Sequence, residues 1–155
     1  MSLTIEPASA LSPEAGALLR QLDAALSAGY EPDQQHGLSV DELEEAHVHF
    51  FLVRLGPKAV GCGAVALFDG YAEIKRMFAS PEARRSGIGK ALITRFEEVA
   101  RRNGQSRLCL ETGIYQDEAI GFYERLGFAR CGAFGPYLGK PPHTIAKSLF
   151  FQKPL

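Results

Sequence analysis

The strongest constraint on the fold is a change of hydrophobic period near residue 80. Before it, the segments His47 to Leu55, Lys58 to Phe68 and Tyr71 to Ala79 are rich in β-branched and aromatic residues, with short glycine-containing turns between them. After it, apolar residues recur at helical spacing from about Gly87 to Asn103. We therefore expect a three-stranded antiparallel meander that leads into a helix.

Shorter elements are predicted on both sides of this meander. Leu3 to Ala8 is typical of a strand, Ser12-Pro13-Glu14 opens a helix, and Ser39 to Ala46 forms a second helix with capping-box spacing. The C-terminal part adds a strand at Arg107 to Thr112, a helix at Gln116 to Leu126, a strand at Phe128 to Ala133 and a last strand near Ile145 to Gln152. This order predicts an α/β fold with a mixed sheet and helices on both faces.

Composition limits the class of protein further. The chain has 155 residues, of which 46% are hydrophobic and 23% charged, and this predicts a single domain, residues 1–155. A formal net charge of −1 with dispersed basic residues argues against a nucleic-acid partner. No apolar run approaches the ~18 residues of a membrane span and no signal-peptide pattern is present, so we expect no membrane partner. Cys62, Cys109 and Cys131 are odd in number and far apart, which favours reduced thiols and a cytoplasmic protein.

The segment Gly87-Ile88-Gly89 lies where a loop joins the predicted helix. Backbone N–H groups are free at a helix start, where the positive end of the helix dipole also lies. Glycines let a phosphate approach closely, and Arg84, Arg85 and Lys90 can add charge-assisted hydrogen bonds. Neither the nucleotide P-loop nor the dinucleotide fingerprint fits this spacing. We interpret the segment as a pyrophosphate site; a glycine-rich turn with two solvated arginines is the alternative.

Two longer motifs carry a resemblance to a known family. The segment Ala72 to Leu92, with Arg84-x-x-Gly87-x-Gly89 at its core, resembles the coenzyme A-binding motif of the GNAT superfamily of N-acyltransferases. Farther on, Ala119 to Phe128 resembles the family's second signature, an Ala-x-x-x-Tyr-x-x-x-Gly-Phe helix and turn. Both occur in the family's order, and the specific part of the resemblance covers about Lys58 to Ala133.

The resemblance implies a GNAT-like fold and a cofactor. In that fold a central, mostly antiparallel sheet is splayed into a V between the strands at Tyr71 to Ala79 and at Arg107 to Thr112. Acetyl-CoA would be the co-substrate, and its pantetheine arm would enter the V and pair with backbone groups of Met77, Phe78 and Ala79. The pyrophosphate would lie on Arg84, Arg85, Ser86, Gly87, Ile88, Gly89 and Lys90. Gln116 stands where the family often has Asn, and its amide keeps a donor and an acceptor for the pantetheine.

Acylation of an amine by a thioester needs a base, an oxyanion contact and an acid. Glu73 stands fourteen residues before Gly87, as does the glutamate base of histone-type family members, and an ion pair with Lys75 or another basic residue on that face is its alternative role. Tyr123 lies in the second signature, where the family's phenol protonates the leaving thiolate; packing of its ring in the core is the alternative. The oxyanion contact is expected from a backbone N–H near Phe78.

Together these residues predict an N-acetyltransferase that moves acetyl from acetyl-CoA to a primary amine by direct attack in a ternary complex. A catalytically inactive acyl-CoA-binding regulatory module is the alternative from another class. The sequence leaves the acceptor open between small-molecule and peptide amines, with Tyr30, Tyr137 and His143 as candidates for lining its pocket. His47 and His49 have no third ligand at a useful spacing, so no metal is expected. The family's habit favours a homodimer over a monomer.

Overall fold

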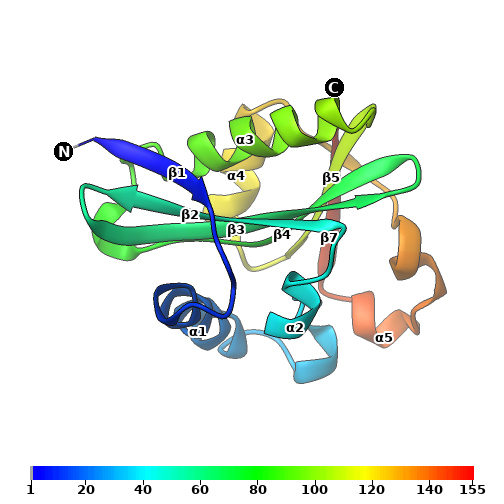
Figure 1. The fold of residues 1–155 in the computed structure, drawn as a ribbon. Helices are drawn as coiled ribbons and strands as arrows, with labels where there is room; N and C mark the ends of the chain where they lie inside the picture. Colours follow the sequence, from blue (N-terminus) through cyan, green and yellow to red (C-terminus); the bar gives the residue numbers. More distant parts are fainter. Residues whose placement is uncertain (1) are drawn as a thin grey trace.

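The computed structural model describes residues 2–155. They form a seven-stranded sheet (Figure 1) whose spatial order is β1-β2-β3-β4-β5-β7-β6. The strands are β1 Leu3–Pro7, β2 Val48–Leu55, β3 Lys58–Phe68, β4 Tyr71–Ala79, β5 Arg107–Gly113, β6 Ala129–Cys131 and β7 Ser148–Pro154. β4 and β5 pair in parallel, and the other neighbouring strands pair antiparallel. The predicted α/β fold with a mixed, mostly antiparallel sheet is confirmed.

Helices cover both faces of this sheet (Figure 1). On one side lie α1 Pro13–Ser27, α2 Val40–Leu43 and α5 Pro142–Ile145, and on the other lie α3 Ile88–Arg102 and α4 Asp117–Arg125. The short 3₁₀ helices are η1 Pro32–Gln34, η2 Pro81–Ala83 and η3 Gly135–Gly139. Within the described chain, no helix combines the length and the apolar character that crossing a membrane requires.

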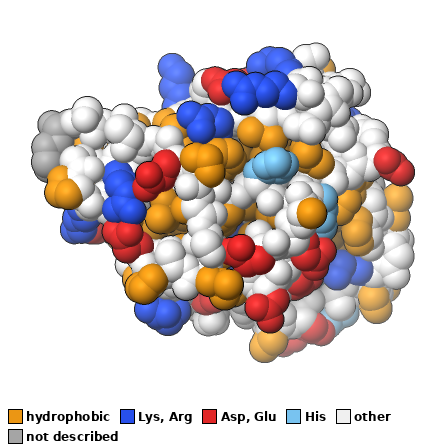
Figure 2. Space-filling view, in the orientation of Figure 1, with side chains coloured by type: hydrophobic (Ala, Val, Ile, Leu, Met, Phe, Trp, Pro, Cys, Tyr) orange, Lys and Arg blue, Asp and Glu red, His pale blue; other side chains and the backbone are white. Residues whose placement is uncertain are grey.

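Capping side chains set the starts of the first two helices. The Ser12 Oγ accepts a hydrogen bond from the Ala15 N–H at 3.3 Å, and Ser39 and Glu42 form the predicted capping box. α2 ends at Leu43, earlier than the predicted Ala46, and Leu43 is the one fully buried residue of this helix. Figure 2 shows acidic side chains gathered on this side of the molecule. Those in and after α2 are all exposed: Asp41, Glu42, Glu44 and Glu45.

The C-terminal part differs most from the sequence-based expectation. β6 ends at Cys131 rather than Ala133, and β7 begins at Ser148 rather than near Ile145. The connection between them, expected to be a plain loop, contains η3 and α5. Both begin with a proline in the first turn, where the missing N–H costs nothing. Tyr137 of η3 is buried, so this connection packs on the sheet instead of projecting into solvent.

The sheet opens between β4 and β5. Only two residue pairs join these parallel strands, Ala72–Leu108 and Glu73–Cys109, and the strands diverge beyond them. β4 also contains a β-bulge, because its register to β3 shifts at Arg76, which has a left-handed φ of 56°. The predicted V is therefore present between the expected strands.

Separate apolar clusters fill the two faces. On the α3 side the largest fully buried members include Leu92, Phe96, Leu108, Leu110 and Phe151. On the α1 side the buried members include Leu18, Leu19, Leu43, Phe50 and Leu52. A smaller, aromatic cluster of Tyr71, Phe134, Tyr137 and Phe150 packs around η3. These clusters fix β4 and β5 from both sides and so hold the V open at a defined place.

Candidate active site

A pocket of about 150 Å³ lies in the V. Its walls are residues 73–77 of β4, residues 110–113 of β5, the first half of α4, and the chain from α1 to Gly37. Tyr123 reaches it from the cluster on the α3 side, whereas Glu73 and Tyr137 reach it from the opposite side. The pocket therefore connects the two faces of the sheet where the strands part.

The start of α3 carries backbone donors without protein partners. Gly87 is the N-cap with a φ of 84°, and its carbonyl accepts the first helical bond, from the Ala91 N–H at 3.0 Å. Within residues 2–155, the N–H groups of residues 87–90 donate to no protein acceptor. The exposed side chains beside them are those of Arg84, Arg85, Ser86 and Lys90. Free N–H groups, the helix dipole and three cations make this a favourable environment for a pyrophosphate.

Gly89 has a packing role that the sequence analysis missed. A Cβ at Gly89 would lie 2.7 Å from the ring of Phe122 in α4. A Cβ at Gly87 would meet no atom within 4 Å, although its positive φ strains any other residue. Gly89 thus lets α3 and α4 approach each other, besides any contact with phosphate. Ile88 is buried in the core, so its N–H, and not its side chain, is available to a ligand.

Met77, Phe78 and Ala79 lie along the V. Phe78 and Ala79 pair with β3 on one edge, and among the described residues none of the three pairs with β5 on the other. The backbone N–H and C=O groups on the β5-facing edge of these residues need hydrogen-bond partners from outside the sheet. An extended ligand arm could supply them as an added strand, which is the role the family resemblance implies.

Tyr123 lies between α4 and the sheet. Its ring packs 5.6 Å from that of Phe128 and 6.4 Å from that of Phe151, measured between centroids. The residue is buried and lines the pocket, and no protein group within residues 2–155 hydrogen-bonds its hydroxyl. Burial raises the pKa of Tyr123, and the charge of Glu111 raises it further. The phenol is therefore a protonated donor at neutral pH.

Glu73 occupies a buried ion pair. Its side chain is 3% exposed, and its Oε2 lies 3.0 Å from the Lys75 Nζ and accepts a hydrogen bond from the Tyr137 hydroxyl at 2.7 Å. The Lys75 ammonium also donates to the His36 carbonyl at 3.1 Å and to the Tyr137 oxygen at 3.0 Å. These contacts agree with the alternative role of Glu73, an ion pair with a basic residue. Its role as the general base stays a prediction.

A second carboxylate, Glu111 of β5, lines the same pocket. The Ser148 hydroxyl donates to its Oε2 at 2.6 Å, and its Oε1 has no protein donor in the part of the chain that the structure describes. Burial raises the pKa of Glu111, although the Ser148 hydrogen bond and the Lys75 charge oppose this shift. No sequence motif pointed to Glu111. The available signal was an acid inside a strand of buried type, where an unpaired carboxylate is costly unless it has a role.

Tyr30 and Gln116 meet at the start of α4, and both line the pocket. The Tyr30 hydroxyl accepts a hydrogen bond from the Tyr115 N–H at 2.9 Å and lies 3.4 Å from the Gln116 Oε1. Gly113 makes this contact possible, because a Cβ there would overlap the Tyr30 hydroxyl. Gln116 is thus held at the pocket by a residue from the α1 side.

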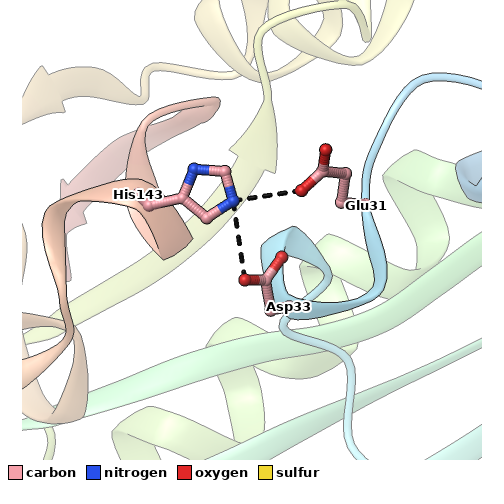
Figure 3. A group of neighbouring side chains, drawn as sticks. All are labelled: Glu31, Asp33 and His143. Carbon is pink, nitrogen blue, oxygen red and sulfur yellow. Dashed lines mark hydrogen bonds and ion pairs between the residues drawn. The ribbon is translucent and has the colours of Figure 1, made fainter.

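His143, a candidate for the pocket wall, lies outside it. Its Nε2 is 3.0 Å from the Glu31 Oε2 and 3.5 Å from the Asp33 Oδ2, and all three side chains are exposed (Figure 3). The contact joins α5 to η1, and the His36 Nε2, 2.7 Å from the Thr144 carbonyl oxygen, adds a second link. Burial lowers the pKa of His36, so this ring stays neutral near pH 7.

Comparison with known proteins identifies the family. The acetyltransferase (GNAT) family model matches residues 18–128. The IAA acetyltransferase of Azospirillum brasilense is 41% identical over 156 residues, which cover 99% of both chains. A Klebsiella pneumoniae crystal structure assigned as an acyl-CoA N-acyltransferase is 34% identical, with a TM-score of 0.82 over 99% of this chain and 97% of the other. The PaiA N-acetyltransferase of Thermoplasma acidophilum, solved with coenzyme A, shares the fold at 16% identity, with a TM-score of 0.76 over 100% of both chains. The chain belongs to the GNAT family of acetyltransferases.

Proposed function

We propose that this protein transfers the acetyl group of acetyl-CoA to a primary amine by direct attack in a ternary complex. The amine nitrogen attacks the thioester carbonyl carbon, the C–N bond forms, the C–S bond breaks, and coenzyme A leaves as the thiol. The acceptor nitrogen loses two protons in the whole reaction. One is matched by the proton that the thiolate gains, and the other passes to solvent through a base.

The observation that carries this proposal is the free hydroxyl of Tyr123 in the V. It lines the pocket, and the start of α3 lies close to α4, because Gly89 packs against Phe122, the residue before Tyr123. The N–H groups of residues 87–90 have no protein acceptor within residues 2–155. Acetyl-CoA as co-substrate is supported by those N–H groups, by the unpaired edge of β4, and by coenzyme A in the similar T. acidophilum structure.

The surrounding groups divide the chemistry. Tyr123 is protonated and unengaged, which suits a general acid for the departing thiolate. A backbone N–H near Phe78, beyond the bulge, is the proposed oxyanion contact. For the base, the geometry favours Glu111 over Glu73, because Glu73 is ion-paired with Lys75 and also bonded by Tyr137, whereas the one donor to Glu111 within residues 2–155 is the neutral Ser148 hydroxyl.

Release of free thiol from acetyl-CoA over a panel of amines tests the proposal. The panel should include amino acids, polyamines, aminoglycosides and a peptide with a free N-terminus, with mass spectrometry of the acetylated product. Amine-dependent thiol release and a matching product would support it. Saturable acetyl-CoA binding without release by any amine would favour the alternative, a binding module.

A further inference from the structure

Arg76 is a buried cation in the pocket wall. Its side chain is 9% exposed, and its Nη1 donates to the Asp23 Oδ1 of α1 at 2.6 Å. The chain at Gly37 runs against it, since a Cβ there would lie 2.8 Å from the Nη1 and 2.9 Å from the Cδ. The ion pair and this backbone contact hold the guanidinium in place.

Only part of this guanidinium is used. The Arg76 Nε is buried and has no hydrogen-bond partner, and within residues 2–155 no protein acceptor meets its Nη2 either. The Nε and Nη2 form one edge of the planar group, and such an edge binds both oxygens of a carboxylate. A buried donor without an acceptor is unfavourable, so this edge points to a ligand that brings the acceptor.

The pocket also contains an unmatched negative group. Glu73 and Lys75 neutralise each other, so within residues 2–155 the charged groups of the pocket wall with unsatisfied polar atoms are Glu111 on β5 and the Nε/Nη2 edge of Arg76 on β4. The volume of about 150 Å³ is below the roughly 300 Å³ at which typical small-molecule sites begin, so a compact ligand is expected.

We propose that the acetyl acceptor is a compact amine that also carries a carboxylate, as an amino acid does, and that the Nε/Nη2 edge of Arg76 binds this carboxylate. Its ammonium group then faces Glu111. This inference rests on the proposed function and names its substrate class.

The test compares each α-amino acid with its amide and with its decarboxylated amine, which keep the side chain and the amine. In the wild-type protein, kcat/KM for the preferred amino acid should exceed that for its amide by about 10-fold or more. Arg76→Gln should remove this preference by raising the KM for the amino acid, with the KM for acetyl-CoA unchanged. Arg76→Lys keeps the charge but loses the planar edge, so it should recover part of the preference.

Arg54→Gln is the matched control. Arg54 of β2 forms ion pairs of 2.6 Å with Glu6 and Glu14 and does not line the pocket, so its loss should leave the amino-acid preference unchanged. Thermal melting shows whether each variant folds. If Arg76→Gln does not fold, the inference is tested by comparing kcat/KM for the amino acid and for its amide in the wild type and in Arg76→Lys.

Equal kcat/KM for amino acids and their amides, or a preference that persists in folded Arg76→Gln, would overturn the inference while acetyl transfer itself stands. If no amine is turned over, the proposed function is contradicted. The carboxylate site can then still be tested by calorimetric titration of the coenzyme A complex with the amino acids. Binding that is lost in Arg76→Gln supports the carboxylate site. Binding that is absent in the wild type, or equal in both proteins, contradicts it.

Discussion

At the scale of single residues, the two carboxylates of the pocket differ in their partners. Glu73 shares one oxygen between Lys75 and Tyr137, so its charge is already compensated. Within residues 2–155 Glu111 has one protein donor, Ser148, and burial raises its pKa. A general base works best when its pKa lies near the operating pH, and a carboxyl group reaches that range only by an upward shift. Glu111 therefore suits proton transfer better than Glu73 does.

Replacing Glu111 by Gln should lower kcat by about 10²-fold while acetyl-CoA affinity is kept, because a positioned base is lost. The wild-type rate should rise with pH through the raised pKa of Glu111, and this rise should be missing in the variant. Glu73→Gln is the comparison, and its main effect should be lower stability, since it leaves Lys75 without its counter-charge. A rise that survives in Glu111→Gln and vanishes in Glu73→Gln would return the base role to Glu73.

Glu111→Gln should also change the stability of the protein in a pH-dependent way. Because the folded-state pKa of Glu111 is raised, the folded protein binds more protons than the unfolded chain above the usual value of 4.5. The contribution of this group to stability is therefore complete below that value and is lost as pH rises through the folded pKa. Glu111→Gln should raise the free energy of unfolding at neutral pH, and the gain should vanish in acid. Urea denaturation across pH measures it; a less stable variant at neutral pH would show that the Ser148 bond outweighs burial.

Tyr123→Phe deletes only the hydroxyl. With no protein partner for that oxygen within the described residues, stability should hardly change, whereas kcat should fall by about 10²-fold because the general acid is gone. Tyr71→Phe, which removes the phenol oxygen of a buried tyrosine outside the pocket, should keep kcat. Full turnover in Tyr123→Phe would assign protonation of the thiolate to water.

At the scale of elements, the sequence predicted the bounds of those strands that are set by local turn residues. β3 and β4 have the predicted bounds because Gly56 and Gly70 allow the tight turns around β3 through their positive φ. The bulge at Arg76 could not be predicted, because it arises from a mismatch in pairing with β3 rather than from the residue itself. The helices η3 and α5 could not be predicted either, because they are held in place by contacts with η1 and with the sheet.

Gly113→Ala tests how β5 and the segment after α1 are joined. The added methyl would overlap the Tyr30 hydroxyl, so Tyr30 must move away from the Tyr115 N–H and from Gln116. We expect a loss of about 1–3 kcal/mol in the free energy of unfolding and a higher acceptor KM. Gly132→Ala is the control, since nothing lies within 4 Å of its Cβ. If both variants melted at the wild-type temperature, the Tyr30 contact would not contribute to stability.

At the scale of the whole molecule, the V joins two sites of different origin. The proposed cofactor side lies in nearly continuous sequence from Met77 to Lys90, so motifs in the sequence were enough to predict it. The proposed acceptor side combines pocket-lining residues that only the fold brings together: Tyr30, Arg76, Glu111 and Tyr137. Of these, sequence patterns pointed to the two tyrosines as candidates and to neither Arg76 nor Glu111. Specificity is therefore encoded in the tertiary arrangement, whereas the chemistry of the family is encoded locally.

The most direct test of the central claim is the initial rate of thiol release measured while acetyl-CoA and an accepted amine are both varied. Both substrates must be present in the V together for direct attack. Double-reciprocal plots should then intersect, and the rate should fall toward zero as either concentration does. Parallel lines, which indicate that the acetyl group passes first to the protein and the thiol leaves before the amine binds, would contradict the ternary mechanism.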